Sequence, residues 1–105
     1  MKKQEKVTAV IELKITPAKD TGFAKISQRI AKFPQVDACF LMSGAYDLLV
    51  FVSGKSLQDV AHFVSAELST IDGVLSTATH FMLKTYKAKG VLEQLGEDGR
   101  LAVTP

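Results

Sequence analysis

The chain has 105 residues, of which 47% are hydrophobic and 23% are charged, with a formal net charge of +2. These values are typical of a single globular domain and exclude the disordered and fibrous classes. The positive charge is too small and too scattered to favour nucleic-acid binding, which needs a basic face. A lone cysteine, Cys39, cannot form an internal disulfide and fits a reducing compartment. No run approaches a membrane span or a signal peptide, so we expect a cytoplasmic domain.

The first predicted elements are a strand and a helix. Apolar side chains occupy every odd position of the stretch Val7–Ile15, a period of two that predicts a strand. Pro17 ends this strand, and Asp20 and Thr21 can cap the helix that follows. The apolar positions of that helix have helical spacing and are Phe23, Ile26, Ile30 and Phe33. Pro34 ends the helix.

Two apolar runs, residues 38–42 and 48–52, are separated by Ser43-Gly44-Ala45-Tyr46-Asp47. The runs read as paired strands, and the break between them reads as a tight turn centred on Gly44, which tolerates positive φ. Asp47 places one carboxylate at the mouth of an otherwise apolar hairpin. A turn with free backbone N–H groups beside one fixed negative charge can hold a small zwitterion.

A second helix and a last strand complete the predicted order. Ser56 with Asp59 resembles a capping box that uses the shorter acid. The apolar stripe of this helix is predicted to be Leu57, Val60, Ala61, Val64, Leu68 and Ile71. Asp72 and Gly73 close the helix, and residues 74–83 are the last strand. A short stretch at residues 91–95 could form a helical turn, and Asp98-Gly99 could form a hairpin turn.

The resulting order, βαββαβ, is the ferredoxin-like arrangement, an α+β fold. Right-handed crossovers place both helices on one face of a four-stranded antiparallel sheet. The hairpin strands are apolar at consecutive positions, so the uncovered face also favours burial. We expect a second copy to cover it in an isologous dimer. The alternative is that the tail, residues 87–105, folds back over that face.

Two stretches of the sequence resemble the effector-binding domain of the Lrp/AsnC family, also called the domain for regulation of amino-acid metabolism. The first is Ser43-Gly44-Ala45-Tyr46-Asp47-Leu48-Leu49, and the second is Gly73-Val74…Thr77-x-Thr79-x-Phe81-x-Leu83-Lys84. The resemblance covers roughly residues 7–86, between a lead-in of residues 1–6 and the tail. Family regulators carry an N-terminal helix-turn-helix that binds DNA. Only six residues precede the first strand here, so we expect a stand-alone effector domain with no direct DNA binding.

The resemblance implies that the domain dimerises through its sheet and that dimers assemble into rings, often octamers or decamers. It also implies that an amino-acid effector binds at contacts between dimers. The implied ligand-binding residues are Ser43, Gly44, Ala45, Tyr46, Asp47, Thr77 and Thr79. Backbone N–H groups around Gly44 could receive a carboxylate, and Asp47 could pair with an α-ammonium group. Full-length regulators of the family are candidate partners, and no cofactor is expected.

Each candidate residue also has a purely structural interpretation. Gly44 can simply supply the positive φ of a hairpin, and Asp47 can accept turn hydrogen bonds. Thr77 and Thr79 are good strand formers, and Tyr46 can serve in packing. Cys39 lies in an apolar run and is typical of a small core residue.

Two other functions remain open. The same scaffold hosts small dimeric monooxygenases and isomerases, but the sequence has no nucleophile–base pair, no paired carboxylates and no cofactor fingerprint. His80 and Asp47 are the only acid–base candidates, and His62, His80 and Cys39 form no recognisable metal spacing. We therefore predict no catalytic and no metal-binding residues. A structural scaffold, or an amino-acid-binding domain of the ACT type, shares the same order of elements.

Overall fold

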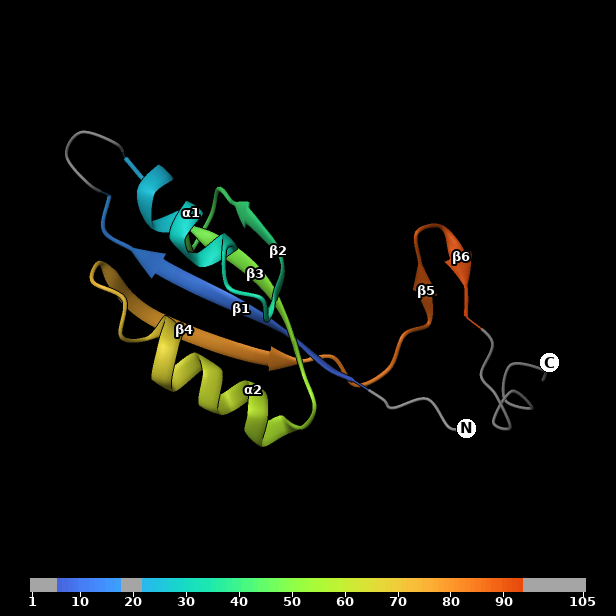
Figure 1. The fold of residues 1–105 in the computed structure, drawn as a ribbon. Helices are drawn as coiled ribbons and strands as arrows, with labels where there is room; N and C mark the ends of the chain where they lie inside the picture. Colours follow the sequence, from blue (N-terminus) through green and yellow to red (C-terminus); the bar gives the residue numbers. More distant parts are fainter. Residues whose placement is uncertain (1–5, 18–21, 94–105) are drawn as a thin grey trace.

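The computed structural model describes residues 6–17 and 22–93 of the chain. The elements follow the predicted order, with bounds β1 (Val7–Ile15), α1 (Ala24–Ala31), β2 (Val36–Leu41), β3 (Leu48–Gly54), α2 (Leu57–Phe63) and β4 (Val74–Phe81). The four strands form one sheet in the order β2-β3-β1-β4, and every neighbouring pair is antiparallel. Both helices lie on the same face of this sheet (Figure 1). The predicted ferredoxin-like α+β fold is confirmed.

The hydrophobic core lies between the sheet and the two helices. In β1 the odd positions were predicted to face inward: Val7 at the start is partly buried, and the other four, Ala9, Ile11, Leu13 and Ile15, are at most 3% exposed. Leu48, Val50 and Val52 on β3 face the same way and are fully buried. The helices contribute Ile30, Val60 and Phe63 to this layer. The period of two in β1 therefore follows directly from one buried face.

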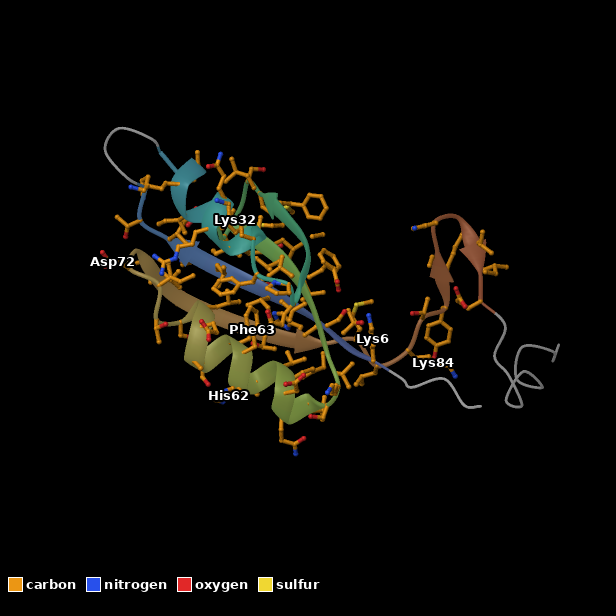
Figure 2. All side chains as sticks on the ribbon, viewed as in Figure 1. Lys6, Lys32, His62, Phe63, Asp72 and Lys84 are labelled. Carbon is orange, nitrogen blue, oxygen red and sulfur yellow. The ribbon has the colours of Figure 1, made fainter. Side chains whose placement is uncertain are left out.

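The first helix begins at Ala24 without a side-chain cap. Asp20 and Thr21, the predicted cap, lie outside the described residues. Phe23 occupies the N-cap position without a side-chain cap, and its carbonyl accepts the Ser27 hydroxyl at 2.7 Å. Phe33 lies just beyond the helix, where its ring meets Phe63 edge to face, with centroids 5.3 Å apart. Phe63 lies over the sheet on the side of the helices (Figure 2).

The second helix has the predicted cap at its start. The Ser56 hydroxyl accepts the Asp59 N–H at 3.0 Å. The Asp59 carboxylate reaches back to the Lys55 N–H at 2.9 Å, one residue earlier than in a standard capping box. The Ser56 hydroxyl therefore satisfies a backbone donor that the helix leaves free, and the Asp59 carboxylate ties down the residue before the N-cap.

The predicted apolar stripe of the second helix is partly wrong. Leu57 is 52% exposed and Ala61 is also exposed, whereas Phe63, which the prediction omitted, is 4% exposed. After Phe63 the helix continues as a π-helical turn, η1 (Val64–Leu68), closed by the Ser69 N–H on the Val64 carbonyl at 2.8 Å. Phe63 and Val64 follow Val60 by three and four residues, the ordinary α-helical spacing, so all three face the sheet.

The second face of the sheet, which we call the open face, is not covered by a helix. Residues directly opposite on neighbouring strands share a face, which places Val10 with Phe51 and His80, and Leu49 with Phe40. Phe40 remains 51% exposed although its ring meets Phe51 edge to face at 6.1 Å. The prediction that the helices cover only one face is confirmed.

The chain after β4 does not fold back over the open face as far as it is described. Residues 82–93 project beyond the end of the sheet (Figure 1). They contain two short strands, β5 (Lys87–Ala88) and β6 (Val91–Leu92), which pair with each other. The helical turn considered for residues 91–95 is therefore wrong at Val91 and Leu92, because the preceding turn pairs them with β5. Asp98-Gly99 lies outside the described residues.

None of the described helices is long and apolar enough to cross a membrane.

Candidate functional site

The turn between β2 and β3 spans residues 43–47 and is held at its base. The strand ladder ends at the Leu41–Leu48 pair, and the Met42 N–H then donates to the Asp47 carbonyl at 2.8 Å. Gly44 has φ +133°, a conformation that side chains disfavour, and no atom lies within 4 Å of where its Cβ would be. The turn is therefore shaped by its glycine, whose positive φ is confirmed, and the space beside that glycine is open.

Asp47 is tied to the end of β1. Its N–H donates to the Leu13 carbonyl at 2.9 Å, and its Oδ2 accepts the Ile15 N–H at 2.9 Å. The last pair between β1 and β3 is Leu13–Leu48, so β3 offers Ile15 no backbone acceptor beyond that point. The carboxylate replaces that acceptor. The structural role considered for Asp47 is real, although its partner is β1 and not the turn itself.

The other oxygen of the same carboxylate is not used in this way. Oδ1 of Asp47 accepts no hydrogen bond from any described residue. Within residues 6–17 and 22–93, no polar side-chain atom is both buried and unpaired, so this unpaired oxygen is not sealed from solvent. One oxygen is thus fixed by the fold, while the second can receive an external donor.

Free backbone donors lie on the same turn. The N–H groups of residues 43–46 donate to no other part of the chain that the structure describes. Ser43, Gly44 and Ala45 are exposed, and Tyr46 is half-buried. A carboxylate and several unpaired N–H groups side by side offer both charges of a zwitterion a partner.

Thr77 and Thr79 lie on the other side of β1 from this turn. They pair with Leu13 and Ile11, which places their side chains on the helix-covered face, and both are half-buried. The predicted common face of the two threonines is therefore present. However, β3 and β4 flank β1 on opposite sides, so two strand spacings, about 10 Å, separate their backbones. The fold groups residues 43–47 together but does not bring the threonines against them within one chain.

A groove of about 880 Å³, which was not predicted from the sequence, lies at the same end of the domain. Two basic residues of α1, Lys25 and Arg29, line it with Lys32 at the C-cap of that helix, together with Thr16 and Gly73. The Thr16 N–H donates to the Gly73 carbonyl at 2.8 Å, one residue after the Ile15 that holds Asp47. These three basic residues are four and three positions apart, which places them on one side of the helix, and this spacing could have indicated a basic surface from the sequence. Figure 2 labels Lys32 on this helix and Asp72 in the turn before β4.

The remaining chemically active side chains lie elsewhere. His80 Nε2 is 3.2 Å from Glu12 Oε2 on the open face, and its partner is therefore Glu12 and not Asp47. Burial raises the pKa of the Cys39 thiol, which makes the reactive thiolate less available. Across the described ranges, no three His, Cys, Asp or Glu side chains converge as metal ligands would.

Comparison with known proteins adds a family relationship to this geometry. Residues 8–92 match the family model of the Lrp/AsnC ligand-binding domain. The chain is 49% identical over 102 residues to the uncharacterized HTH-type transcriptional regulator YugG of Bacillus subtilis, covering 96% of this chain and 61% of YugG. The chain spans about half to three fifths of the length of the curated relatives it matches.

Solved structures share the fold. The transcriptional regulator NMB0573 of Neisseria meningitidis, determined as a complex with L-Met, superposes with a TM-score of 0.68 at 28% identity. That match covers 85% of this chain and 57% of the regulator. AsnC of E. coli superposes with a TM-score of 0.71 at 22% identity, covering 79% of this chain and 54% of AsnC. At that identity the likeness to AsnC concerns the fold alone.

Proposed function

Because the chain belongs to the Lrp/AsnC ligand-binding domain family, we propose that it is a cytoplasmic regulatory module that binds a small amino acid or a related metabolite. Its biological role is the regulation of amino-acid metabolism at the level of transcription. The relatives it matches are transcriptional regulators, which favours a regulatory role over an enzymatic one. The observation that carries the proposal is that the two carboxylate oxygens of Asp47 differ. Oδ2 accepts the Ile15 N–H, whereas Oδ1 has no partner among the described residues.

The ligand is held by its two charged groups. Its α-ammonium donates to Oδ1 of Asp47, in a charge-assisted hydrogen bond that is stronger than a neutral one. Its carboxylate accepts from the unpaired N–H groups of residues 43–46. The hydrogen bond from the Ile15 N–H fixes the carboxylate of Asp47 before the ligand arrives, so little ordering cost remains for binding.

The site is completed where copies of the domain meet. One small amino acid cannot span about two strand spacings, so Thr77 and Thr79 reach the same ligand only from a second copy. Dimers form through the open face, and the dimers associate further into a ring. Full-length regulators of the same family are candidate members of such assemblies, since they carry the same domain.

A thermal-shift panel with the proteinogenic amino acids at millimolar concentration tests the proposal. A ligand at about 100 times its Kd stabilises the native state by about 2.7 kcal/mol, which is enough for a clear rise in Tm. We expect one or a few amino acids to raise Tm. The variant Asp47→Asn keeps an acceptor for Ile15 but loses the charge, so we expect it to lose that rise.

The matched control is Asp37→Asn, which removes a charge from an exposed position on β2. This variant should keep the full response. No shift with any amino acid, or an undiminished shift in Asp47→Asn, contradicts the proposal. Asp47→Asn is preferred to Asp47→Ala here because it separates ligand recognition from the structural bond to β1.

A further inference from the structure

Residues 82–93, which we call the C-terminal arm, form an ordered hairpin that stands apart from the rest of the domain. The Met82 N–H makes the last hydrogen bond to the sheet, on the Thr8 carbonyl at 2.9 Å. Lys89 and Gly90 then form a two-residue turn with φ values of 51° and 79°, the signs that a tight hairpin turn requires. The Glu93 N–H closes the hairpin on the Tyr86 carbonyl at 2.9 Å.

The arm exposes large apolar side chains on almost every side. Leu83 is 91% exposed, and the others, Tyr86, Val91 and Leu92, are 64–74% exposed. Figure 1 shows the hairpin well beyond the end of β4, and Lys84 marks its base in Figure 2. A two-stranded hairpin with no packing surface is marginally stable in water. The arm therefore requires an apolar surface to pack on, and it does not lie on that of its own domain (Figure 1).

The apolar surface that fits the arm is the open face of the sheet, because the arm begins at its edge. Met82 pairs with Thr8 by its hydrogen bond and continues the alternation of Ala78 and His80, which places its side chain, 47% exposed, on the open face. The apolar side chains of the arm thus follow directly on the apolar surface that we propose as the dimer interface. A second copy docked on the open face also lies beside the arm.

We propose that the C-terminal arm of each copy packs against the body of the partner copy, so that the two arms clasp the dimer. This inference rests on the proposed dimer through the open face. The clasp adds the apolar area of the arm to an interface that otherwise consists of one sheet face. It also gives the domain a second contact element that can be altered without touching the sheet.

Intermolecular paramagnetic broadening in NMR tests the clasp directly. Unlabelled Val91→Cys protein, in a Cys39→Ala background and carrying a nitroxide at position 91, is mixed with ¹⁵N-labelled wild-type protein. We expect broadening of amides in residues 6–81 of the labelled copy. A nitroxide at Ser65→Cys, exposed on η1, is the matched control and should leave the same amides sharp. No broadening from position 91, or equal broadening from position 65, overturns the clasp.

Dimer affinity supplies the second test. The double variant Val91→Ser/Leu92→Ser should raise the dimer dissociation constant at least tenfold, while Leu57→Ser, a 52% exposed leucine on α2, should not change it. An unchanged constant in the double variant overturns the clasp but leaves the open-face dimer standing. A wild-type protein that stays monomeric overturns both. Amino-acid binding is measured in a separate thermal-shift experiment, so a failure of the proposed amino-acid binding can be told apart from a failure of the clasp or of the open-face dimer.

Discussion

Asp47 shows how one side chain can serve the fold and a ligand together. Its Oδ2 takes the N–H of Ile15 at the point where β3 no longer pairs with β1, and its Oδ1 stays open. A residue chosen only for the fold could be asparagine, because the amide oxygen accepts the same bond. The charge is therefore the part of Asp47 that we assign to the ligand.

The stability cost of losing this bond distinguishes the two roles. Asp47→Ala leaves the N–H of Ile15, a residue only 3% exposed, without its acceptor. An unpaired buried donor costs about 1–3 kcal/mol, so we expect the free energy of unfolding to fall by that amount in urea titrations. Asp47→Asn should lose less than about 1 kcal/mol. Equal stability of wild type and Asp47→Ala would show that water replaces the carboxylate.

Among the elements, α2 depends most on its first residues. It has seven residues before the π-helical turn, too few to be stable from propensity alone. The Ser56 and Asp59 side chains satisfy two backbone donors at its start, and Val60 and Phe63 anchor it to the sheet. Its stability thus comes from the cap and from tertiary packing together.

The contribution of the cap can be measured with two serines. Ser56→Ala removes the acceptor of the Asp59 N–H, and we expect a loss of about 1 kcal/mol in the free energy of unfolding. Ser65→Ala is the control, because its hydroxyl only donates to the His62 carbonyl at 3.3 Å on an exposed surface. Equal losses in both variants would mean that the cap contributes nothing specific.

At the scale of the whole molecule, the domain has two surfaces that a monomer leaves apolar. These are the open face, around Phe40, Phe51 and Val10, and the C-terminal arm. Glu12 Oε2 on β1 and His80 Nε2 on the edge strand β4 lie 3.2 Å apart on the open face, within this apolar surrounding. Exposed apolar surface of this kind is typical of a protein–protein interface.

Two neighbouring residues of β2 provide a matched test of the dimer. Phe40 and Leu41 are 51% and 64% exposed but point to opposite faces of the sheet. Phe40→Asp places a charge in the proposed interface and should raise the dimer dissociation constant at least tenfold, about 1.4 kcal/mol, in sedimentation experiments. Leu41→Asp should leave the constant unchanged. Dissociation by Leu41→Asp alone would move the interface to the other face.

Strands were easier to predict than helices, for a physical reason. The alternation in β1 reflects a single buried face, and its bounds at Val7 and Ile15 were correct. In α2 several neighbouring apolar residues fit a helical stripe, and only packing on the sheet decided that Phe63 is buried while Leu57 and Ala61 are exposed. Likewise, β5 and β6 are two residues each, too short for any periodicity to indicate them.

The sequence by itself determined the order of elements, the one-sided helix layer and the turn around Gly44 and Asp47, because periodicity and glycine conformation act locally. Only the tertiary structure decided which oxygen of Asp47 is occupied, since its partner Ile15 lies 32 residues away. It also decided that β1 separates the turn from Thr77 and Thr79, and that the arm projects from the sheet. Such relations depend on strand order and register, which bring together residues distant in the chain.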